Sequence, residues 1–229
     1  MTKKLVITID GPAGAGKSTV SKALAAKLSY LYLDTGALYR AIAYQVKQEG
    51  IAPTDEARLS ELSRTVNICL KNVDGQMRIF LKGEDVTDKI RTEEISMLAS
   101  TVSARPCVRE ALLHLQREAG ARGGIVAEGR DMATVVFPQA DYQFYLDASV
   151  AARAKRRYGE LMARNGQANF AEIEKDIIVR DKQDRERAIA PLKPAPRAVL
   201  IDSTSMTVRE VVERIAACIG SPEQELAIP

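Results

Sequence analysis

Apolar residues in the first third of the chain follow two patterns that alternate along the sequence. Residues 5–9, LVITI, are almost all apolar or β-branched, which predicts a strand buried on both faces. Residues 17–28 place Val20, Leu24 and Leu28 on one side of a helix. The same two patterns predict a short strand at 31–33 and helices at 36–48 and 59–62.

A different pattern occupies residues 64–90, where apolar and polar residues alternate one by one. Alternation with a period of two predicts half-buried strands. Asp74-Gly75, near the centre of this stretch, is a strong hairpin turn. Because a hairpin interrupts the order of strands and helices before it, we expect an inserted β element here.

The rest of the chain returns to strands and helices. A helix is predicted at 92–100, and another begins at Pro106, which suits a first helical turn, and ends near Gly120. Strands are predicted at 123–131, 142–147 and 198–202, helices at 149–165, 171–188 and 208–219, and a loose tail at 220–229. Strands that alternate with helices predict an α/β fold with a five-stranded parallel sheet flanked by helices.

Composition narrows the class of protein. The 229 residues are 46% hydrophobic and 28% charged, which is typical of a folded chain with one large domain or a core with small inserted lobes. A net charge of +3 is too mild to suggest a nucleic-acid partner, but it suits small polyanions. We expect a monomer, since no exposed apolar stripe is apparent.

Two further features bear on the location of the chain. No segment approaches the roughly 18 apolar residues of a membrane span, and the basic N-terminus precedes an apolar run too short for a signal peptide. The three cysteines, Cys69, Cys107 and Cys218, lack metal-ligand spacing. We therefore expect a cytoplasmic protein with reduced cysteines and no membrane partner.

The clearest chemical motif lies between the first strand and the first helix. Gly11-x4-Gly16-Lys17-Ser18 satisfies the pattern of a P-loop, and it has the required strand before it and helix after it. Glycines let successive backbone N–H groups converge on a phosphate at the positive end of the helix. Lys17 can reach the β- and γ-phosphates, and the Ser18 hydroxyl can bind Mg²⁺.

The use of the bound nucleotide has to be inferred from the rest of the chain. Neither the NKxD motif of GTPases nor the LSGGQ motif of transporter ATPases occurs. The chain instead carries many arginines and one histidine, His114, which we assign to a helix without catalytic duty. Since the second pKa of a phosphate is about 6, a phosphate acceptor needs cations against charge repulsion more than it needs a general base.

Two turns carry candidate acceptor residues. Thr35 precedes the second predicted helix and Arg40 follows within it; alternatively, they are a helix cap and a solvated arginine. Arg130 and Asp131 come just after a core strand, where ligands bind in open α/β sheets. The alternative for this second pair is a salt-bridged turn, which its location makes less favoured.

Two arginine-rich helices complete the candidates. Arg180, Asp184 and Arg187 share one face of a helix, but Asp181 with Arg185 forms an i,i+4 pair on the other, so a salt-bridged surface helix is the alternative. The run at 152–166 has few aromatics and fits a mobile lid that brings arginines to ATP better than it fits a nucleic-acid site.

In this order the motifs GPAGAGKST, LDTGALYR, RTEEIS, ASTVSARPCVRE, EGRDMATVVFP, DRERAIAPL and IDST resemble those of the bacterial cytidylate kinase family over roughly residues 5–217. The resemblance implies a P-loop kinase with a β-containing insert in its acceptor-binding lobe and a short helical lid. It implies a core at about 1–34, 106–150 and 190–220, an acceptor lobe at 35–105 and a lid at 151–189. The implied reaction transfers phosphate from MgATP to CMP or dCMP.

The resemblance also implies the residues of the site. ATP would contact Gly11, Pro12, Ala13, Gly14, Ala15, Gly16, Lys17, Ser18, Thr19, Arg156 and Arg157, with Ser18 at the metal. CMP would contact Thr35, Tyr39, Arg40, Ser100, Arg109, Arg130, Asp131, Arg180, Asp184 and Arg187. Lys17, Arg130, Arg180 and Arg187 would be catalytic.

The acceptor residues divide by the part of CMP that each would contact. Ser100, Arg109 and Asp131 would contact the cytosine edge, and Asp184 the sugar hydroxyl. The listed arginines at 40, 130 and 187 would hold the acceptor phosphate, with the one at 180 beside them. Threonine at position 35 is often serine in the family, and the position of Ser18 is glycine in some relatives, so its metal role is not constant.

Two alternatives remain open from the residues. One is a kinase for UMP, AMP or another small acceptor, which Asp131 and Arg109 oppose only if the fold brings them together. The other is a nucleotide-switched binding protein whose basic helices engage RNA or a protein partner. Turnover measured with several nucleoside monophosphates as acceptors tests the first alternative. Salt-sensitive binding of a polynucleotide would support the second.

Overall fold

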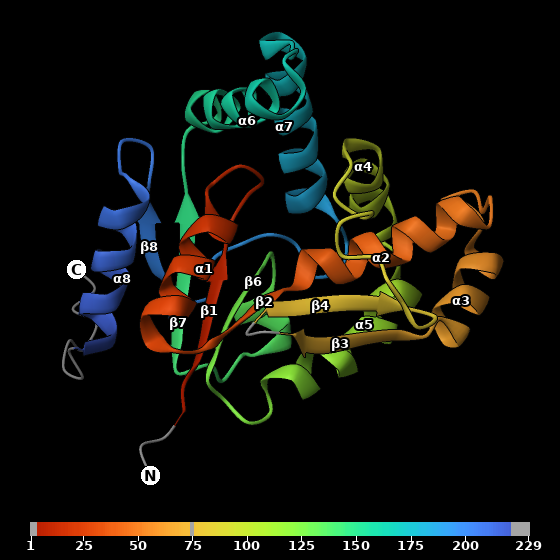
Figure 1. Cartoon of the computed structure of the whole chain (residues 1–229), viewed down its shortest axis with the longest axis horizontal. Coiled ribbons are helices and arrows are strands. Elements are labelled where there is room, and N and C mark those ends of the chain that lie inside the picture. The colour runs from red at the N-terminus through yellow and green to blue at the C-terminus, as the bar shows by residue number, and fades with distance from the viewer. Residues whose placement is uncertain (1–3, 74–75, 221–229) are drawn as a thin grey trace.

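A five-stranded parallel sheet forms the centre of the computed structural model, which describes residues 4–73 and 76–220 (Figure 1). The strands are β1 (Val6–Asp10), β2 (Leu31–Asp34), β6 (Ile125–Gly129), β7 (Tyr142–Asp147) and β8 (Val199–Asp202), in the order β2-β6-β1-β7-β8. β1 lies at the centre and pairs with β6 and β7 in parallel. The carboxyl ends of all five strands therefore face the same edge.

Helices cover both faces of this sheet. α1 (Lys17–Leu28) and α8 (Val208–Gly220) pack on one face, where Leu24 and Ile215 meet Ile9 and Phe144 in one apolar cluster. α5 (Pro106–Gly120) and a π-helical turn, η1 (Met132–Val136), pack on the other face. This arrangement confirms the predicted α/β sheet flanked by helices.

A second body of structure is built from residues between β2 and α5. It contains α2 (Thr35–Gln48), α3 (Glu56–Thr65), α4 (Glu93–Val102) and a three-stranded antiparallel sheet of β3 (Ile68–Val73), β4 (Gln76–Leu81) and β5 (Glu84–Asp85). These elements share one apolar cluster with the first turns of α5. Strands β3 and β4 pair from Ile68–Leu81 to Val73–Gln76, as expected of the inserted hairpin; its turn, Asp74-Gly75, lies outside the described residues.

Two further helices, α6 (Val150–Asn165) and α7 (Phe170–Glu186), pack on each other above the sheet edge (Figure 1). Their small apolar cluster contains Ala154, Ile173 and Ile177. Ser149 caps α6 through Ala152 N, and Asn169 caps α7, which explains where each helix begins. The pair therefore has its own small core and joins the rest through its ends.

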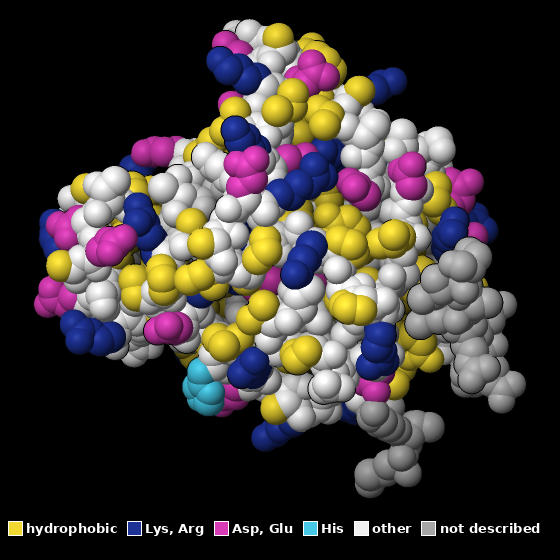
Figure 2. Space-filling model, turned by 180° about the vertical axis from the view of Figure 1, so that it is seen from behind, with side chains coloured by type: hydrophobic (Ala, Val, Ile, Leu, Met, Phe, Trp, Pro, Cys, Tyr) yellow, Lys and Arg dark blue, Asp and Glu magenta, His cyan; other side chains and the backbone are white. Residues whose placement is uncertain are grey.

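The element boundaries agree with the sequence patterns to within a few residues, and η1 and β5 are the elements that the patterns did not predict. The tail at 221–229 lies outside the described residues. In the part of the chain that is described, no helix is long and apolar enough to cross a membrane. On the face seen in Figure 2, acidic and basic side chains are interspersed, in keeping with the small net charge of +3.

Candidate functional site

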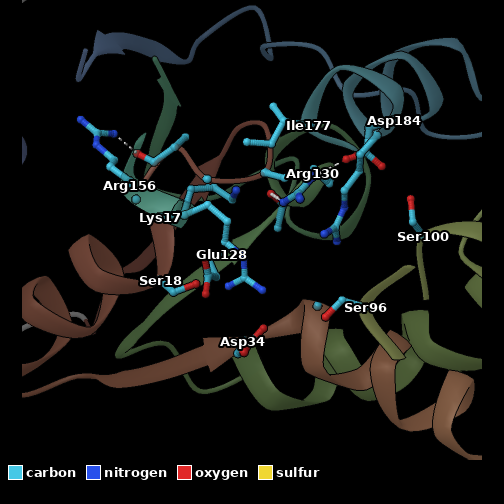
Figure 3. Close-up of a pocket in the computed structure, with 18 of the residues that line it drawn as sticks. Lys17, Ser18, Asp34, Ser96, Ser100, Glu128, Arg130, Arg156, Ile177 and Asp184 are labelled. Atoms are coloured by element: carbon cyan, nitrogen blue, oxygen red, sulfur yellow. Dashed lines mark hydrogen bonds and ion pairs between the residues drawn. The ribbon is translucent and has the colours of Figure 1, made fainter. Parts of the chain in front are cut away.

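A cavity of about 780 Å³ lies at the carboxyl edge of the sheet. Its walls come from the turn after β1, from the ends of β2 and β6, and from α2, α4, α6 and α7. Figure 3 shows polar side chains from these elements converging on it. Ligands of open α/β sheets bind at this edge because the loops after the strands gather there.

The loop from Gly11 to Gly16 has the geometry of a phosphate cradle, and its residues 13–16 form one wall of the cavity. Gly11 has φ 149°, and a Cβ there would stand 2.0 Å from the carbonyl oxygen of Leu146. Gly16 has φ 90° at the cap position of α1, where a glycine offers no capping side chain. The first N–H groups of α1 are consequently left for a ligand, at the positive end of the helix dipole.

Lys17 is buried at the base of this loop. Its ammonium donates to the carbonyl of Pro12 at 2.7 Å. Burial, and then the positive charge of Arg130, lower the pKa of Lys17 to about 7. A lysine in this position is electrostatically unsatisfied, and an anion beside it would restore its charge.

Two carboxylates, Asp34 and Glu128, line the same cavity as Lys17, and the sequence analysis assigned no role to them. Glu128, at the end of β6, accepts a hydrogen bond from the hydroxyl of Tyr32. Burial, and then the charge of Asp34, raise the pKa of Glu128, and the nearby Ser18 hydroxyl acts to lower it. In Figure 3, Ser18, Glu128 and Asp34 border one side of the cavity. Two carboxylates and a hydroxyl beside a phosphate cradle are the oxygen ligands that Mg²⁺ prefers, so these residues fit a magnesium ion.

Three guanidinium groups with unpartnered nitrogens line the cavity. Among the described residues, Arg40 Nε, Arg180 Nε and Arg187 Nη2 are buried without a hydrogen-bond partner. Burial, and then the charge of Arg130, lower the pKa of Arg180 to about 10, while burial and Arg109 lower that of Arg187. Buried donors are rarely left unpaired, so the geometry calls for an anion among these arginines.

Arg130 and Asp184 connect the end of β6 to α7. Arg130 Nε donates to Asp184 at 2.7 Å. Burial alone would lower the pKa of Arg130, but Asp184 and then Glu128 outweigh it and raise that pKa. Burial would raise the pKa of Asp184, and Arg130 reverses this and lowers it. The pair therefore stays ionised and fixes α7 against the sheet.

A second buried pair lies deeper on the acceptor side. Arg109, from α5, pairs with Asp131 and also donates to the carbonyl of Ser103 at 3.1 Å. Its guanidinium lies 5.4 Å from the ring centre of Tyr39. All four of these residues line the cavity. The fold thus brings Arg109 and Asp131 together, which was the condition on which the sequence argument for them depended.

The lid arginines have partners in this structure. Arg156 donates to the carbonyls of Ala15 and Ser203, so it lies at the phosphate loop as expected. Arg157 pairs with Glu93 of α4, and Ser100 Oγ donates to Gln183 of α7 at 3.2 Å. These last two contacts join α6 and α7 to α4 beside the cavity.

Two sequence expectations need correction. The cap of α2 is Asp34 rather than Thr35: the Asp34 carboxylate accepts from Ala37 N at 3.0 Å and from Arg40 at 2.7 Å. Thr35 is the first helical residue, and its hydroxyl donates to the carbonyl of Glu128 at 2.7 Å. The predicted Asp181–Arg185 pair is also wrong, because Asp181 is buried and turns both oxygens toward another arginine, at position 153.

The cavity gathers nearly all the residues expected in the site. Gly11 and Pro12 are the two that do not line it, although the Pro12 carbonyl accepts from Lys17. The residues that line it are Ala13, Gly14, Ala15, Gly16, Lys17, Ser18, Thr19, Thr35, Tyr39, Arg40, Ser100, Arg109, Arg130, Asp131, Arg156, Arg157, Arg180, Asp184 and Arg187.

Asp34 and Glu128 also line the cavity, and the sequence analysis assigned no role to either, although both lie within its motifs. Their position offered a usable indication, because both stand at the carboxyl ends of predicted strands. Polar residues at that edge of an open sheet deserve a functional interpretation even where a neighbouring residue of the same motif is the more obvious candidate.

Comparisons with known proteins agree with this geometry. The family model for cytidylate kinase matches residues 7–221. A cytidylate kinase of Geobacter sp. (strain M21) is 50% identical over 91% of this chain and 90% of its own length. One from Citrifermentans bemidjiense is 48% identical, with 94% and 92% covered, and one from Geobacter sulfurreducens is 46% identical, with 98% and 96% covered.

Proposed function

The chain belongs to the cytidylate kinase family, and from this we propose that its cavity transfers the terminal phosphate of ATP to CMP and dCMP, giving ADP with CDP or dCDP. One observation carries the proposal. Arg40, Arg180 and Arg187, each with a buried nitrogen that lacks a hydrogen-bond partner, line a cavity whose other wall is a phosphate cradle. Two polyanions can meet in such a cavity only because cations surround the point of transfer.

On the donor side, the loop from Gly11 to Gly16 and the first turn of α1 hold the phosphates of ATP. Lys17 exchanges its bond to the Pro12 carbonyl for one to the β- and γ-phosphates. Its pKa, about 7 in the present structure, rises as the phosphate charge arrives, so that it binds as a cation.

On the acceptor side, Arg40, Arg180 and Arg187 bind the phosphate of CMP. An oxygen of this phosphate attacks the γ-phosphorus of ATP, the bond to the β-γ bridging oxygen breaks, and ADP leaves with the electron pair. Since a phosphate monoester is largely a dianion at neutral pH, no general base is needed. Arg130 lies between the two sides and neutralises the charge shared during transfer.

The base is recognised by the pair of Arg109 and Asp131, with Ser100 beside them. A carboxylate accepts from the N4 amino group of cytosine, and a guanidinium donates to O2 and N3. Uracil presents an oxygen where cytosine has its amino group, so Asp131 would repel it. Asp184, held by Arg130, accepts from a sugar hydroxyl.

Ser18, Glu128 and Asp34 would hold the magnesium ion that accompanies ATP. The ion would neutralise phosphate charge when bound. The hydroxyl of Tyr32 fixes the Glu128 carboxylate by a hydrogen bond, and the cap bond from Ala37 fixes Asp34. Both carboxylates are consequently oriented before any ion arrives.

The division into lobes follows from the apolar clusters. We assign the core to about 1–34, 106–150 and 190–220, the acceptor-binding lobe to 35–105 and the lid to 151–189. The α6–α7 pair has an apolar cluster of its own, whereas the cluster of the acceptor lobe continues into α5 of the core, so we expect the lid to be the part that moves. Closure of the lid would exclude water from the transferring phosphate.

We further propose a cytoplasmic monomer that binds no nucleic acid. Nucleotide substrates of this kind belong to the cytosol, and the three cysteines are unpaired. The exposed large apolar side chains of the described residues lie mainly on the lid, whose surface has to stay free for closure. Light scattering on the purified chain would report one chain per particle.

The acceptor panel tests the reaction. ADP release from MgATP is measured with CMP, dCMP, UMP and AMP at equal concentrations. We expect CMP and dCMP to be turned over much faster than UMP and AMP. Fast turnover of UMP with none of CMP or dCMP would contradict the proposal.

A further inference from the structure

Arg153, on the first turn of α6, is with Asp10 one of the two most deeply buried charged residues of the described chain that do not line the cavity. Its side chain is 2% exposed. Nε donates to the carbonyl of Ala148 at 2.9 Å, and Nη1 donates to the carbonyl of Ala13 at 3.0 Å. Both terminal nitrogens also contact Asp181 of α7, at 2.9 and 2.5 Å. One side chain thus joins the phosphate loop, the end of β7 and both lid helices.

The bond to Ala13 fixes the orientation of one peptide group in the phosphate loop. In a trans peptide the carbonyl and the following N–H point in opposite directions. When Arg153 holds the Ala13 carbonyl away from the cavity, the N–H of Gly14 turns toward it. A flip of this peptide would put an oxygen where a phosphate has to bind.

Packing at Gly14 supports the same conclusion. Gly14 has φ 76°, and a Cβ there would stand 3.1 Å from the Cβ of Arg153 and 3.5 Å from its carbonyl oxygen. The loop therefore rests directly on the backbone of α6. In Figure 1 the turn between β1 and α1 rises toward α6. Contact and hydrogen bond together leave this part of the loop little freedom.

Asp181 completes the arrangement by holding Arg153 through both of its oxygens. A two-point contact with a carboxylate fixes the plane of a guanidinium, which a lysine ammonium cannot reproduce. The next peptide with an outward carbonyl, Ala15–Gly16, is held separately, since the hydroxyl of Ser203 lies 3.2 Å from the Ala15 oxygen. It provides an internal reference within the same loop.

We propose that Arg153 is a positioning residue for the donor nucleotide: oriented by Asp181, it holds the Ala13 carbonyl outward so that the Gly14 N–H binds a phosphate of ATP or ADP. The proposal rests on the proposed function, since it presumes that this loop binds the donor. Arg153 is shielded from the cavity and does not itself contact the nucleotide.

The test replaces Arg153 by lysine in the full chain and uses Arg185→Lys, at an exposed position of α7, as the matched control. ADP affinity is measured by calorimetry, and backbone amide shifts of Gly14 and Gly16 are measured by NMR with and without MgADP. We expect R153K to lower the affinity for ADP by about tenfold or more, which corresponds to the loss of one oriented hydrogen bond. The ADP-induced downfield shift of Gly14 should shrink, while that of Gly16 and the KM for CMP stay close to those of R185K.

A second variant separates positioning from stability. The double substitution Arg153→Met with Asp181→Leu removes both charges together, and buried ion pairs can often be replaced by apolar residues without loss of stability. We expect this variant to melt near the unmodified chain and still to bind ADP about tenfold more weakly.

The outcomes distinguish the inference from the function on which it rests. Unchanged ADP affinity and an unchanged Gly14 shift in R153K would overturn the inference alone. Equal losses of the Gly14 and Gly16 shifts, in proportion to a lower melting temperature, would also overturn it, because they would indicate general loosening. Failure of the unmodified chain to bind ADP or ATP would overturn the proposed function itself.

Discussion

At the scale of single residues, the site is distinguished by buried arginines that lie close together and lower one another's pKa. Arg180 and Arg187 both have a lowered pKa because they are buried and close to other arginines. Arg187 donates through Nε to the carbonyl of Ala190 at 2.6 Å, which leaves Nη2 unpartnered. Such groups are costly in the free protein and become favourable only when an anion arrives.

We therefore expect Arg187→Ala to lower turnover strongly and Arg185→Ala to leave it nearly unchanged. Arg187 lines the cavity, whereas Arg185 is exposed on the other side of α7. Removing one donor that stabilises transition-state charge lowers turnover by about 10²-fold or more. The measurement is ADP release from MgATP with saturating CMP. Equal losses from the two variants would mean that the wrong face of α7 has been assigned to the site.

A second residue-scale prediction concerns the choice of base. Asp131→Asn replaces a side chain that only accepts hydrogen bonds by an amide that can also donate one. The substitution should therefore weaken the binding of CMP and allow a hydrogen bond to the O4 of uracil. We expect kcat/KM for CMP to fall by about 10²-fold and the ratio of UMP to CMP turnover to rise. The acceptor panel supplies both values. If the CMP:UMP ratio stayed that of the unmodified chain, Asp131 would not contact the base.

At the scale of elements, the π-helical turn η1 explains how Arg130 and Asp131 are held. The carboxylate of Asp10, the last residue of β1, accepts from Met132 N and Ala133 N, both at 2.8 Å. These are the first N–H groups of η1, which would otherwise be buried without partners. Asp10 thus connects the strand that precedes the phosphate loop with the turn that directly follows Arg130 and Asp131.

This connection predicts a dependence of stability on pH. Burial raises the pKa of Asp10 from 3.8 to about 6, against the opposing effect of its two backbone hydrogen bonds. The folded chain therefore binds this proton more tightly than the unfolded chain. The stabilisation that this proton gives is fully present below pH 3.8 and is lost as the pH rises through about 6.

Relative to Asp10→Asn, the unmodified chain should lose about 3 kcal/mol of unfolding free energy across that interval. Urea unfolding of both proteins at a series of pH values measures the difference. Asp88→Asn, which removes an exposed carboxylate, is the control and should show almost none of it. A constant difference between the unmodified chain and Asp10→Asn would mean that Asp10 does not titrate in this range.

At the scale of the whole molecule, the parallel sheet, the elements between β2 and α5, and the α6–α7 pair meet around one cavity. The lid touches the acceptor lobe through Arg157–Glu93 and through Ser100–Gln183, both beside the cavity. Its own apolar cluster is small, so most of its fixation comes from polar contacts that nucleotides can rearrange. Such a body is suited to opening and closing on each catalytic cycle.

We expect hydrogen exchange to fall in α6 and α7 when MgADP and CMP are bound together. Closure would bury the faces of these helices that line the cavity, whereas amides of β1 and β6 are already buried and should change little. Mass spectrometry of deuterated peptides measures both sets. Equal protection of the lid by CMP alone would show that closure does not depend on the donor nucleotide.

The sequence by itself determined the elements and the clearest motif. The helix from Lys17 to Leu28 and the strand from Tyr142 to Asp147 were predicted at the bounds that the structure has, because apolar periodicity is a local property. The phosphate loop was predicted for the same reason, since its glycines, lysine and serine are contiguous. Arg180 and Asp184 share a face of α7 because helix geometry fixes their spacing, and Arg187 follows as the residue that caps this helix.

Only the tertiary structure decided which residues meet across elements. In the sheet order β2-β6-β1-β7-β8, β2 lies next to β6, and Asp34 is paired with Glu128 although the two residues are far apart in the sequence. Asp181 likewise pairs with Arg153 of α6 and not with Arg185 of its own helix. Asp181 and Arg153 are both buried, whereas Arg185 is exposed. The pairing of distant residues depends on how whole elements pack, and burial determines how much each charged side chain costs without a partner. The spacing of residues along one helix reports neither the pairing nor the burial.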